Sequence, residues 1–282
     1  ALHSNFLNAD QFMSVSEPAS NETKPTQSSG TGVILVPDDL DLKITATVNK
    51  LLFSGTTLSA LQGELLVLNS SLSLQNGGFK LAGSEMKMNA SYVSNGMRNA
   101  TFDFNVQATD FDVKKMYDSV KLFREMATSA GKAQGIVSLE YQLKGKLDKN
   151  MQPIFPSLEG GGVLSVKKVK VKGLRLLNAI SKSTGEDKVA DPDISKVNIK
   201  TTVKNNVITL ERFKIKMAGF RLRMEGQSSF DGQIKFKMRL GLPPLGIIGI
   251  PMQITGTQSN PKIKLGNRDR EDVEETEYQE EE

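Results

Sequence analysis

The residues that could do chemistry are few in this 282-residue chain. It has no Cys and a single His, His3. Thiol nucleophiles, Ser-His triads, His metal clusters and zinc fingers need residue types that are absent or present once. No G-x-x-x-x-G-K-[ST] loop occurs, and Gly160-Gly161-Gly162 does not fit G-x-G-x-x-G. Most enzyme classes are therefore excluded, and we expect a protein that is not an enzyme and uses no cofactor or metal.

Carboxylates are the remaining groups with catalytic potential, since a pair of acids can hydrolyse a glycoside. Glu140 and Glu225 lie inside strong strand patterns, but the chain has no Trp to stack on a sugar. Asp110-Phe111-Asp112 and Asp191-Pro192-Asp193 are too short for EF-hand loops. We interpret the first as a helix cap and the second as a turn.

Apolar and polar residues alternate with period two along most of the chain after Leu40, the pattern of half-buried strands. Asn76-Gly77-Gly78, Asn95-Gly96, Asn205-Asn206 and Asp231-Gly232 have the composition of hairpin turns between such strands. The sequence predicts a mainly β fold of about a dozen antiparallel strands.

Two segments have helical spacing instead. Residues 110–129 carry apolar side chains three to four residues apart, with Asp110 or Asp112 as N-cap, and residues 174–184 repeat the pattern up to Gly185. Two short helices cannot cover a dozen half-apolar strands. The apolar face must close as a sandwich, a barrel or a curled, groove-like sheet, and alternation does not distinguish these arrangements.

Composition divides the chain into three parts. Residues 1–36 hold one short strand and a polar linker expected to be mobile, residues 37–266 form the β domain, and residues 267–282 form a disordered acidic tail. Residues 185–193 are a further loop that we expect to be mobile. No run of 18 apolar residues occurs, and the start at Ala1 is consistent with a piece of a longer protein.

The charge is concentrated on strands. Residues 40–267 hold 33 basic and 18 acidic residues, and many bases alternate with apolar residues, which predicts one apolar and one positive face. This basic surface could attract anionic lipid headgroups or be an ordinary solvated face. We expect no nucleic-acid partner, because aromatic residues do not interleave the charges. The basic candidates are Lys168, Lys170, Lys214, Lys216, Arg221, Arg223, Lys235 and Lys237.

The apolar face is rich in Met on strand interiors, which makes a soft and adaptable surface. Core packing is one explanation, and a groove for flexible acyl chains is another. The candidate groove residues are Leu42, Ile44, Val48, Leu72, Leu74, Val137, Leu139, Ile215, Leu222, Met224, Phe236 and Met238.

The order of several short motifs resembles a known family. Residues 37–42 (PDDLDL), 61–65 (LQGEL), 108–113 (ATDFDV), 158–162 (LEGGG) and 251–261 (PMQITGTQSNP) follow one another as in the C-terminal domain of the AsmA family of Gram-negative envelope proteins, in the style of its Bacteroidetes members. The resemblance covers about residues 4–266. The acidic tail is not part of it.

The resemblance implies a curled β structure with a hydrophobic groove, in the periplasm, tethered to the inner membrane by an N-terminal anchor that this chain lacks. It also implies phospholipid transport to the outer membrane, and no catalytic residues. Our first hypothesis is a non-enzymatic module that binds phospholipid or another acyl lipid and supports envelope integrity. The alternative is a scaffold or assembly factor for outer-membrane proteins, with other envelope proteins as partners. A carbohydrate-binding domain is the third reading, weakened by the absence of Trp.

Overall fold

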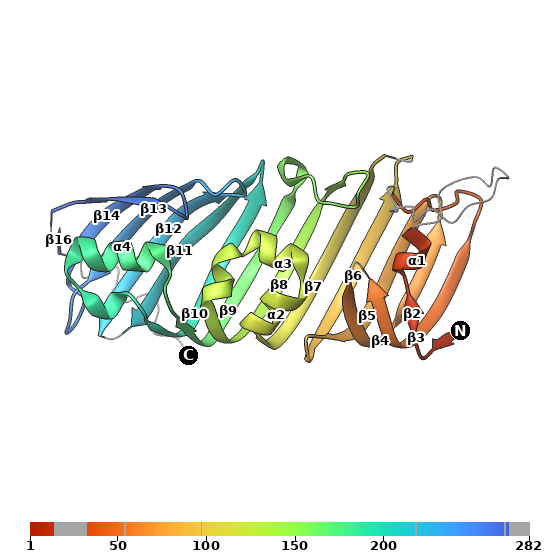
Figure 1. Ribbon diagram of the computed structural model, residues 1–282, viewed down its shortest axis with the longest axis horizontal. Coiled ribbons are helices and arrows are strands. Elements are labelled where there is room, and N and C mark those ends of the chain that lie inside the picture. The colour runs from red at the N-terminus through yellow and green to blue at the C-terminus, as the bar shows by residue number, and fades with distance from the viewer. Residues whose placement is uncertain (14–32, 54, 97, 218, 268, 271–282) are drawn as a thin grey trace, which may run out of the picture. The chain divides into compact units, whose positions relative to one another are not determined.

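The computed structural model describes residues 1–13, 33–53, 55–96, 98–217, 219–267 and 269–270 (Figure 1). These residues are mainly in β-strands, which confirms the predicted fold class. The predicted linker at residues 14–32 and the acidic residues 271–282 lie outside the described part.

The strands are β1 (Leu2–Ser4), β2 (Leu7–Asn8), β3 (Leu42–Phe53), β4 (Thr56–Leu68), β5 (Ser71–Leu81), β6 (Ser84–Ser94), β7 (Ala100–Asp112), β8 (Ala133–Leu147), β9 (Glu159–Val171), β10 (Asp193–Lys204), β11 (Val207–Met217), β12 (Phe220–Ser229), β13 (Ile234–Gly241), β14 (Ile248–Gly256), β15 (Pro261–Leu265) and β16 (Asp269–Arg270). The helices are α1 (Asp10–Met13), α2 (Val113–Ser119), α3 (Lys121–Met126) and α4 (Arg175–Thr184), with 3-10 turns η1 (Thr128–Lys132), η2 (Phe155–Ser157) and η3 (Asp187–Val189).

The described strands belong to one sheet in which neighbours in sequence are neighbours in space from β3 to β15. β1 and β2 pair with β3 in parallel, so the sheet is mixed at this end, whereas we expected antiparallel pairing. β16, inside the segment expected to be disordered, pairs with β14 beyond the end of β15. The path ends at β1 and β15 without closing, which excludes a barrel of the described strands.

Two compact units divide the chain. Unit 1 contains residues 1–111, 139–162 and 203–206, and unit 2 contains residues 112–138, 163–202 and 207–282. Each unit includes a continuous run of antiparallel strands, β3–β7 in unit 1 and β11–β15 in unit 2. The two runs differ in what covers their apolar face.

Unit 2 has a packed core. The register places Ile215, Leu222 and Leu240 side by side on one face of β11–β13, and all three are buried. In Figure 1, α4 lies in front of β11–β14. Its Leu177 and Ile180 are buried, and Arg175 donates a hydrogen bond to the Ser259 carbonyl at 2.8 Å. An amphipathic helix with a buried apolar side therefore lies against the β15 end of this run.

The segment predicted as one helix over residues 110–129 is divided. β7 continues to Asp112, and α2 and α3 are separated by Val120, whose extended backbone (φ −117°, ψ 109°) interrupts the helix. Asp112 is the N-cap, and its Oδ1 accepts a hydrogen bond from the Lys115 amide at 2.9 Å. Asp110, the other candidate cap, lies in β7 with φ 51°.

Asp112→Ala removes this cap. We expect unfolding stability to fall by about 1 kcal/mol, because an amide at the start of α2 loses its acceptor. Urea denaturation of the variant measures the change. Asp118→Ala, at the other end of α2, removes a carboxylate that contacts only exposed Lys114 in an ion pair of 2.6 Å, and should cost less. Equal losses in the two variants would contradict the capping role.

Two segments predicted as a loop and as a hairpin turn contain regular secondary structure. Residues 185–193 contain η3, and Val189 is fully buried there. The Asp191 carboxylate accepts a hydrogen bond from the Gly173 amide at 2.9 Å, which anchors the segment. Asn76-Gly77-Gly78 is not a hairpin turn but a bulge inside β5, where the pairing register with β6 shifts between Leu74 and Gly77. No helix among the described residues is both long enough and apolar enough to cross a membrane.

Candidate functional site

The apolar face of unit 1 is built as four rows of side chains that cross β3–β7. Each row takes one residue from each strand, and the antiparallel register pairs neighbouring members directly except between β4 and β5 in rows 3 and 4, where the register shifts. Row 1 is Leu42, Val67, Leu72, Tyr92 and Phe102; row 2 is Ile44, Leu65, Leu74, Ala90 and Phe104; row 3 is Ala46, Gly63, Gly77, Met88 and Val106; row 4 is Val48, Leu61, Phe79, Met86 and Ala108.

Burial falls steadily from row 4 to row 1. Every residue of row 4 is buried, every residue of row 2 is half-buried, and Leu42 in row 1 is 38% exposed. The side chains of rows 1 and 2 are apolar apart from the hydroxyl of Tyr92. We call rows 1 and 2 the open rows. In a sandwich a second layer would bury them, but here they keep partial contact with solvent.

The open rows follow from the helix content of this unit. Among the described residues of unit 1, the one α-helix is α1, which has four residues. Such a helix cannot cover a face five strands wide, since a strand spacing of about 4.8 Å makes that face roughly 20 Å across. Unit 2, in which strands of similar pattern are more deeply buried, contains the longer amphipathic helix α4.

One border of the open rows is defined by residues 33–36. The Tyr92 hydroxyl donates a hydrogen bond to the Ile34 carbonyl at 2.9 Å, and the Val36 amide donates one to the Ser94 hydroxyl at 3.1 Å. Burial raises the pKa of Tyr92 and the hydrogen bond to Ile34 lowers it, burial being the larger effect, so the hydroxyl stays protonated at neutral pH as in any tyrosine. The Tyr92 hydroxyl is therefore held in place at the edge of row 1. The Phe102 ring of row 1 stacks on the Phe104 ring of row 2, with their ring centroids 5.9 Å apart.

The structure divides the predicted groove residues into two groups. Leu42 is exposed, Ile44, Leu72, Leu74 and Leu139 in unit 1 are half-buried, and Val48 is buried in row 4. Five of those in unit 2 are buried, and Met224 is half-buried; the five buried residues are Val137, Ile215, Leu222, Phe236 and Met238. These five therefore belong to the buried core of unit 2 and do not line a groove.

Sequence reasoning missed six of the ten residues in the open rows. Leu65 and Val67 were not assigned to a strand, since bulges interrupt the alternation of β4, and Ala90 and Tyr92 of β6 were also overlooked. Phe102 and Phe104 were recognised as strand residues but not as groove candidates. The usable signal for β6 was the alternation of Met86, Met88, Ala90 and Tyr92.

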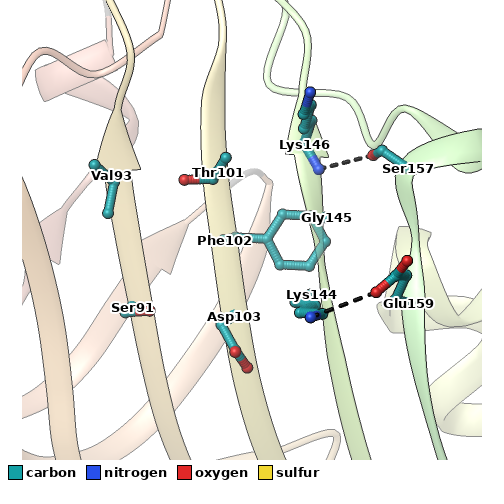
Figure 2. A pocket seen from close by; sticks show the side chains of 10 residues that line it. All are labelled: Ser91, Val93, Thr101, Phe102, Asp103, Lys144, Gly145, Lys146, Ser157 and Glu159. Carbon is teal, nitrogen blue, oxygen red and sulfur yellow. Dashed lines mark hydrogen bonds and ion pairs between the residues drawn. The ribbon is translucent and has the colours of Figure 1, made fainter.

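Behind row 1, on the opposite face, unit 1 has an open hollow of about 310 Å³ (Figure 2). Lys144 and Glu159 form an ion pair of 3.4 Å at its side, and the Lys146 amide donates a hydrogen bond to the Ser157 hydroxyl at 2.8 Å. Figure 2 shows the Phe102 ring beside Gly145, between these groups and the strand of Thr101 and Asp103. Donors and acceptors for a small polar group surround the hollow. A second polar hollow of about 300 Å³ is lined by His3 and its neighbours.

Gly145 lies between the hollow and row 1, and because it has no side chain only its backbone separates them there. A Cβ at this position would lie 2.6 Å from Leu158 Cδ2 and 3.4 Å from the Phe102 ring. Leu158 is fully buried. Phe102 thus belongs both to row 1 and to the lining of the hollow. Among the described residues, no group of three or more His, Cys, Asp or Glu could hold a metal ion.

The basic candidates gather on the polar face of unit 2. The register places Lys214, Arg223 and Arg239 opposite one another, and Lys216 opposite Arg221. Lys168 and Lys170 are exposed on β9. We define the basic face as Lys214, Lys216, Arg221, Arg223, Lys235, Lys237, Arg239, Lys262 and Lys264.

One acid lies within this basic face. The bulge between Leu210 and Phe213 brings Arg212 to Glu225, with Nε 2.8 Å from the carboxylate. The hydrogen bond from Arg212 is the main cause that lowers the pKa of Glu225, and the charges of Arg212, Lys237 and Arg223 act in the same direction. Glu225 is therefore ionised at neutral pH and engaged by Arg212.

The comparisons with known proteins give no relatives. No protein-family model matches the chain, no curated protein matches it, and no solved structure matches it. The features that bear on function are the open rows and the hollow of unit 1 and the basic face of unit 2.

Proposed function

We propose that this protein is a non-enzymatic lipid-binding module that shelters acyl chains on the open rows of unit 1. The observation that carries the proposal is the burial gradient across β3–β7, which leaves two adjacent rows of apolar side chains half-exposed. Apolar patches that remain accessible on a folded protein commonly serve to bind something.

The physical reason is the cost of hydrocarbon in water, about 0.8 kcal/mol for each CH₂ group. An acyl chain that lies along the open rows recovers part of this energy and also completes the burial of Leu65, Leu74 and Phe104. No covalent chemistry is required. The Tyr92 hydroxyl, and the Lys144, Ser157 and Glu159 side chains at the hollow behind row 1, offer hydrogen-bonding groups near the same strands.

The resemblance to the C-terminal domain of the AsmA family supports the wider setting. We propose on this basis that the module works in the periplasm of a membrane-anchored protein and contributes to phospholipid transport toward the outer membrane. The absence of a catalytic constellation in the sequence agrees with such a role.

Native mass spectrometry of the purified chain, with lipid extraction alongside, tests the proposal. We expect bound masses of phospholipid size that disappear on extraction. Leu65→Glu in row 2 and Leu42→Glu in row 1 should each reduce the bound fraction about tenfold, because a carboxylate on the face opposes hydrocarbon contact. Leu42 is exposed enough for its variant to fold.

Leu68→Glu is the matched control. Leu68 lies on β4 like Leu65 but points to the opposite face, where it is 47% exposed. Circular dichroism of all three variants verifies folding. A lipid-free wild-type chain, or equal lipid content in Leu42→Glu and Leu68→Glu, would overturn the proposal.

The alternative, a scaffold that binds outer-membrane proteins by strand addition, has weaker support. β15 at one end of the sheet has five residues, begins with Pro261 and carries Lys262 and Lys264. Short edges with Pro and Lys are typical of strands that avoid pairing with other chains. Saturable binding of unfolded β-barrel segments without lipid would favour this alternative.

A further inference from the structure

A second surface, in unit 2, combines charge with exposed apolar side chains. Residues 242–247 connect β13 to β14, and Leu245 and Ile247 in this loop are 57% and 47% exposed. Large aliphatic side chains with this exposure at a loop tip are not explained by packing within the unit. We call residues 242–247 the apolar loop.

The apolar loop is held against the basic face. Arg239 donates hydrogen bonds to the Gly246 carbonyl at 3.0 Å and to the Ile247 carbonyl at 2.7 Å. The loop also contacts Arg221, since a Cβ at Gly246 would lie 2.8 Å from Arg221 Cδ. Backbone hydrogen bonds from Leu242 to Ile248 and from Gly246 to Leu242, both 2.8 Å, close the loop on itself. Its geometry is therefore fixed relative to β12–β14.

The basic face beside the apolar loop is strongly positive. The register brings nine Lys and Arg side chains onto one side of β11–β15, and Glu225 among them is engaged by Arg212. Most of these side chains are exposed, including Lys216, Lys235 and Lys264. Lysine and arginine are charged at neutral pH, so the surface presents a dense positive potential to solvent.

We propose that the basic face and the apolar loop together dock unit 2 on a membrane surface that contains anionic phospholipid. The cations would contact headgroup phosphates, and Leu245 and Ile247 would enter the boundary of the acyl region. This inference concerns another face of another unit and does not depend on acyl binding by the open rows.

The alternative partner for a positive surface is a single-stranded nucleic acid, which needs aromatic side chains between the charges for base stacking. The aromatic residues of these strands, Phe213, Phe220 and Phe236, are buried on the opposite face. Exposed aliphatic side chains suit hydrocarbon and do not stack on bases. Charge and apolar chemistry together therefore favour the membrane.

Vesicle co-sedimentation at low ionic strength tests the proposal, with phosphatidylcholine vesicles that contain or lack phosphatidylglycerol. We expect binding only to the anionic vesicles and loss of binding in high salt. The triple variant Lys216→Gln, Lys235→Gln, Lys264→Gln should bind about 100-fold more weakly, since each basic residue near an anionic surface contributes about fivefold.

The matched control is Lys50→Gln, Lys80→Gln, Lys87→Gln in unit 1, which has the same net charge and also removes exposed lysines. Leu245→Ser should weaken binding about tenfold by removing an inserted side chain, whereas Leu68→Ser, on an exposed leucine of unit 1, should not.

Equal vesicle binding by the two triple variants would overturn the proposal, as would equal binding to neutral and anionic vesicles. If the triple variant of unit 2 lost binding to an oligonucleotide but kept its binding to vesicles, the membrane proposal would be overturned in favour of a nucleic-acid partner. Leu42→Glu separates the two proposals, because it should lower co-purified lipid without changing sedimentation with anionic vesicles.

Discussion

Leu222→Glu is expected to prevent unit 2 from folding. Leu222 is 2% exposed and lies between Ile215 and Leu240, both buried, in the register of β11–β13. A carboxylate there would lose its hydration without gaining a partner, which costs several kcal/mol even after its pKa rises. Soluble yield and urea unfolding followed by circular dichroism measure the effect.

Leu42→Glu gives the comparison, because the same change on the open rows leaves the new carboxylate in contact with water. Its unfolding midpoint should stay close to that of the wild type. If Leu222→Glu unfolds at the wild-type midpoint, the face of β11–β13 is not a closed core. If Leu42→Glu is as unstable as Leu222→Glu, row 1 is covered and the lipid proposal loses its basis.

Gly162→Ala is expected to cause the second large effect. An added Cβ would lie 2.0 Å from the carbonyl oxygen of Glu140 and 2.6 Å from Tyr141 Cδ2, both in β8. The neighbouring strand would have to move, because a backbone oxygen cannot rotate away as a side chain can. We expect a loss of about 3 kcal/mol, which lowers the melting temperature by roughly 10 °C for units of this size.

Gly78→Ala in β5 is the control for a glycine inside a strand. No heavy atom lies within 4 Å of a Cβ at this position. Its melting temperature should remain near that of the wild type or rise slightly, since alanine reduces the entropy of the unfolded chain. Equal melting of Gly162→Ala and wild type would show that β8 and β9 are not as close as the structure has them.

Local patterns predicted the parts of the fold that depend on neighbouring residues. The alternation of apolar and charged residues identified β11, β12 and β13, and α4 ends at Gly185 in the left-handed region (φ 76°), as its position predicted. Asn205-Asn206 and Asp231-Gly232 do connect consecutive strands. In each case the signal and the structure lie within about ten residues of each other.

Irregular backbone was the first source of error. Ala60 and Asn76 adopt φ 51°, and at both points the pairing register shifts. A bulge moves the apolar positions out of period two, so β4 was not recognised and the bulge in β5 was interpreted as a turn. No glycine stands at position 60 or directly beside it, so nothing in the sequence indicated the bulge in β4.

The second source of error was that segments far away in sequence can bury the apolar face of a strand. Leu72 and Leu222 occupy equivalent positions in alternating strands, yet one is half-buried and the other fully buried. Unit 2 contains the amphipathic helix α4, which is separated from β12 by more than thirty residues in sequence, and unit 1 has no such helix among its described residues. Alternation identifies an apolar face but contains no information about what covers it.

The sequential order of the strands has a consequence for how such a chain can change length. From β3 to β15, strands that are consecutive in sequence pair with each other. Insertion or deletion of two consecutive strands would leave the direction of all later strands, and every other pairing, unchanged. A single strand would reverse the direction of everything that follows. Gene duplication or loss of hairpins could therefore widen or narrow this sheet in steps of two strands, which makes its width a property that evolution can adjust without inventing a new fold.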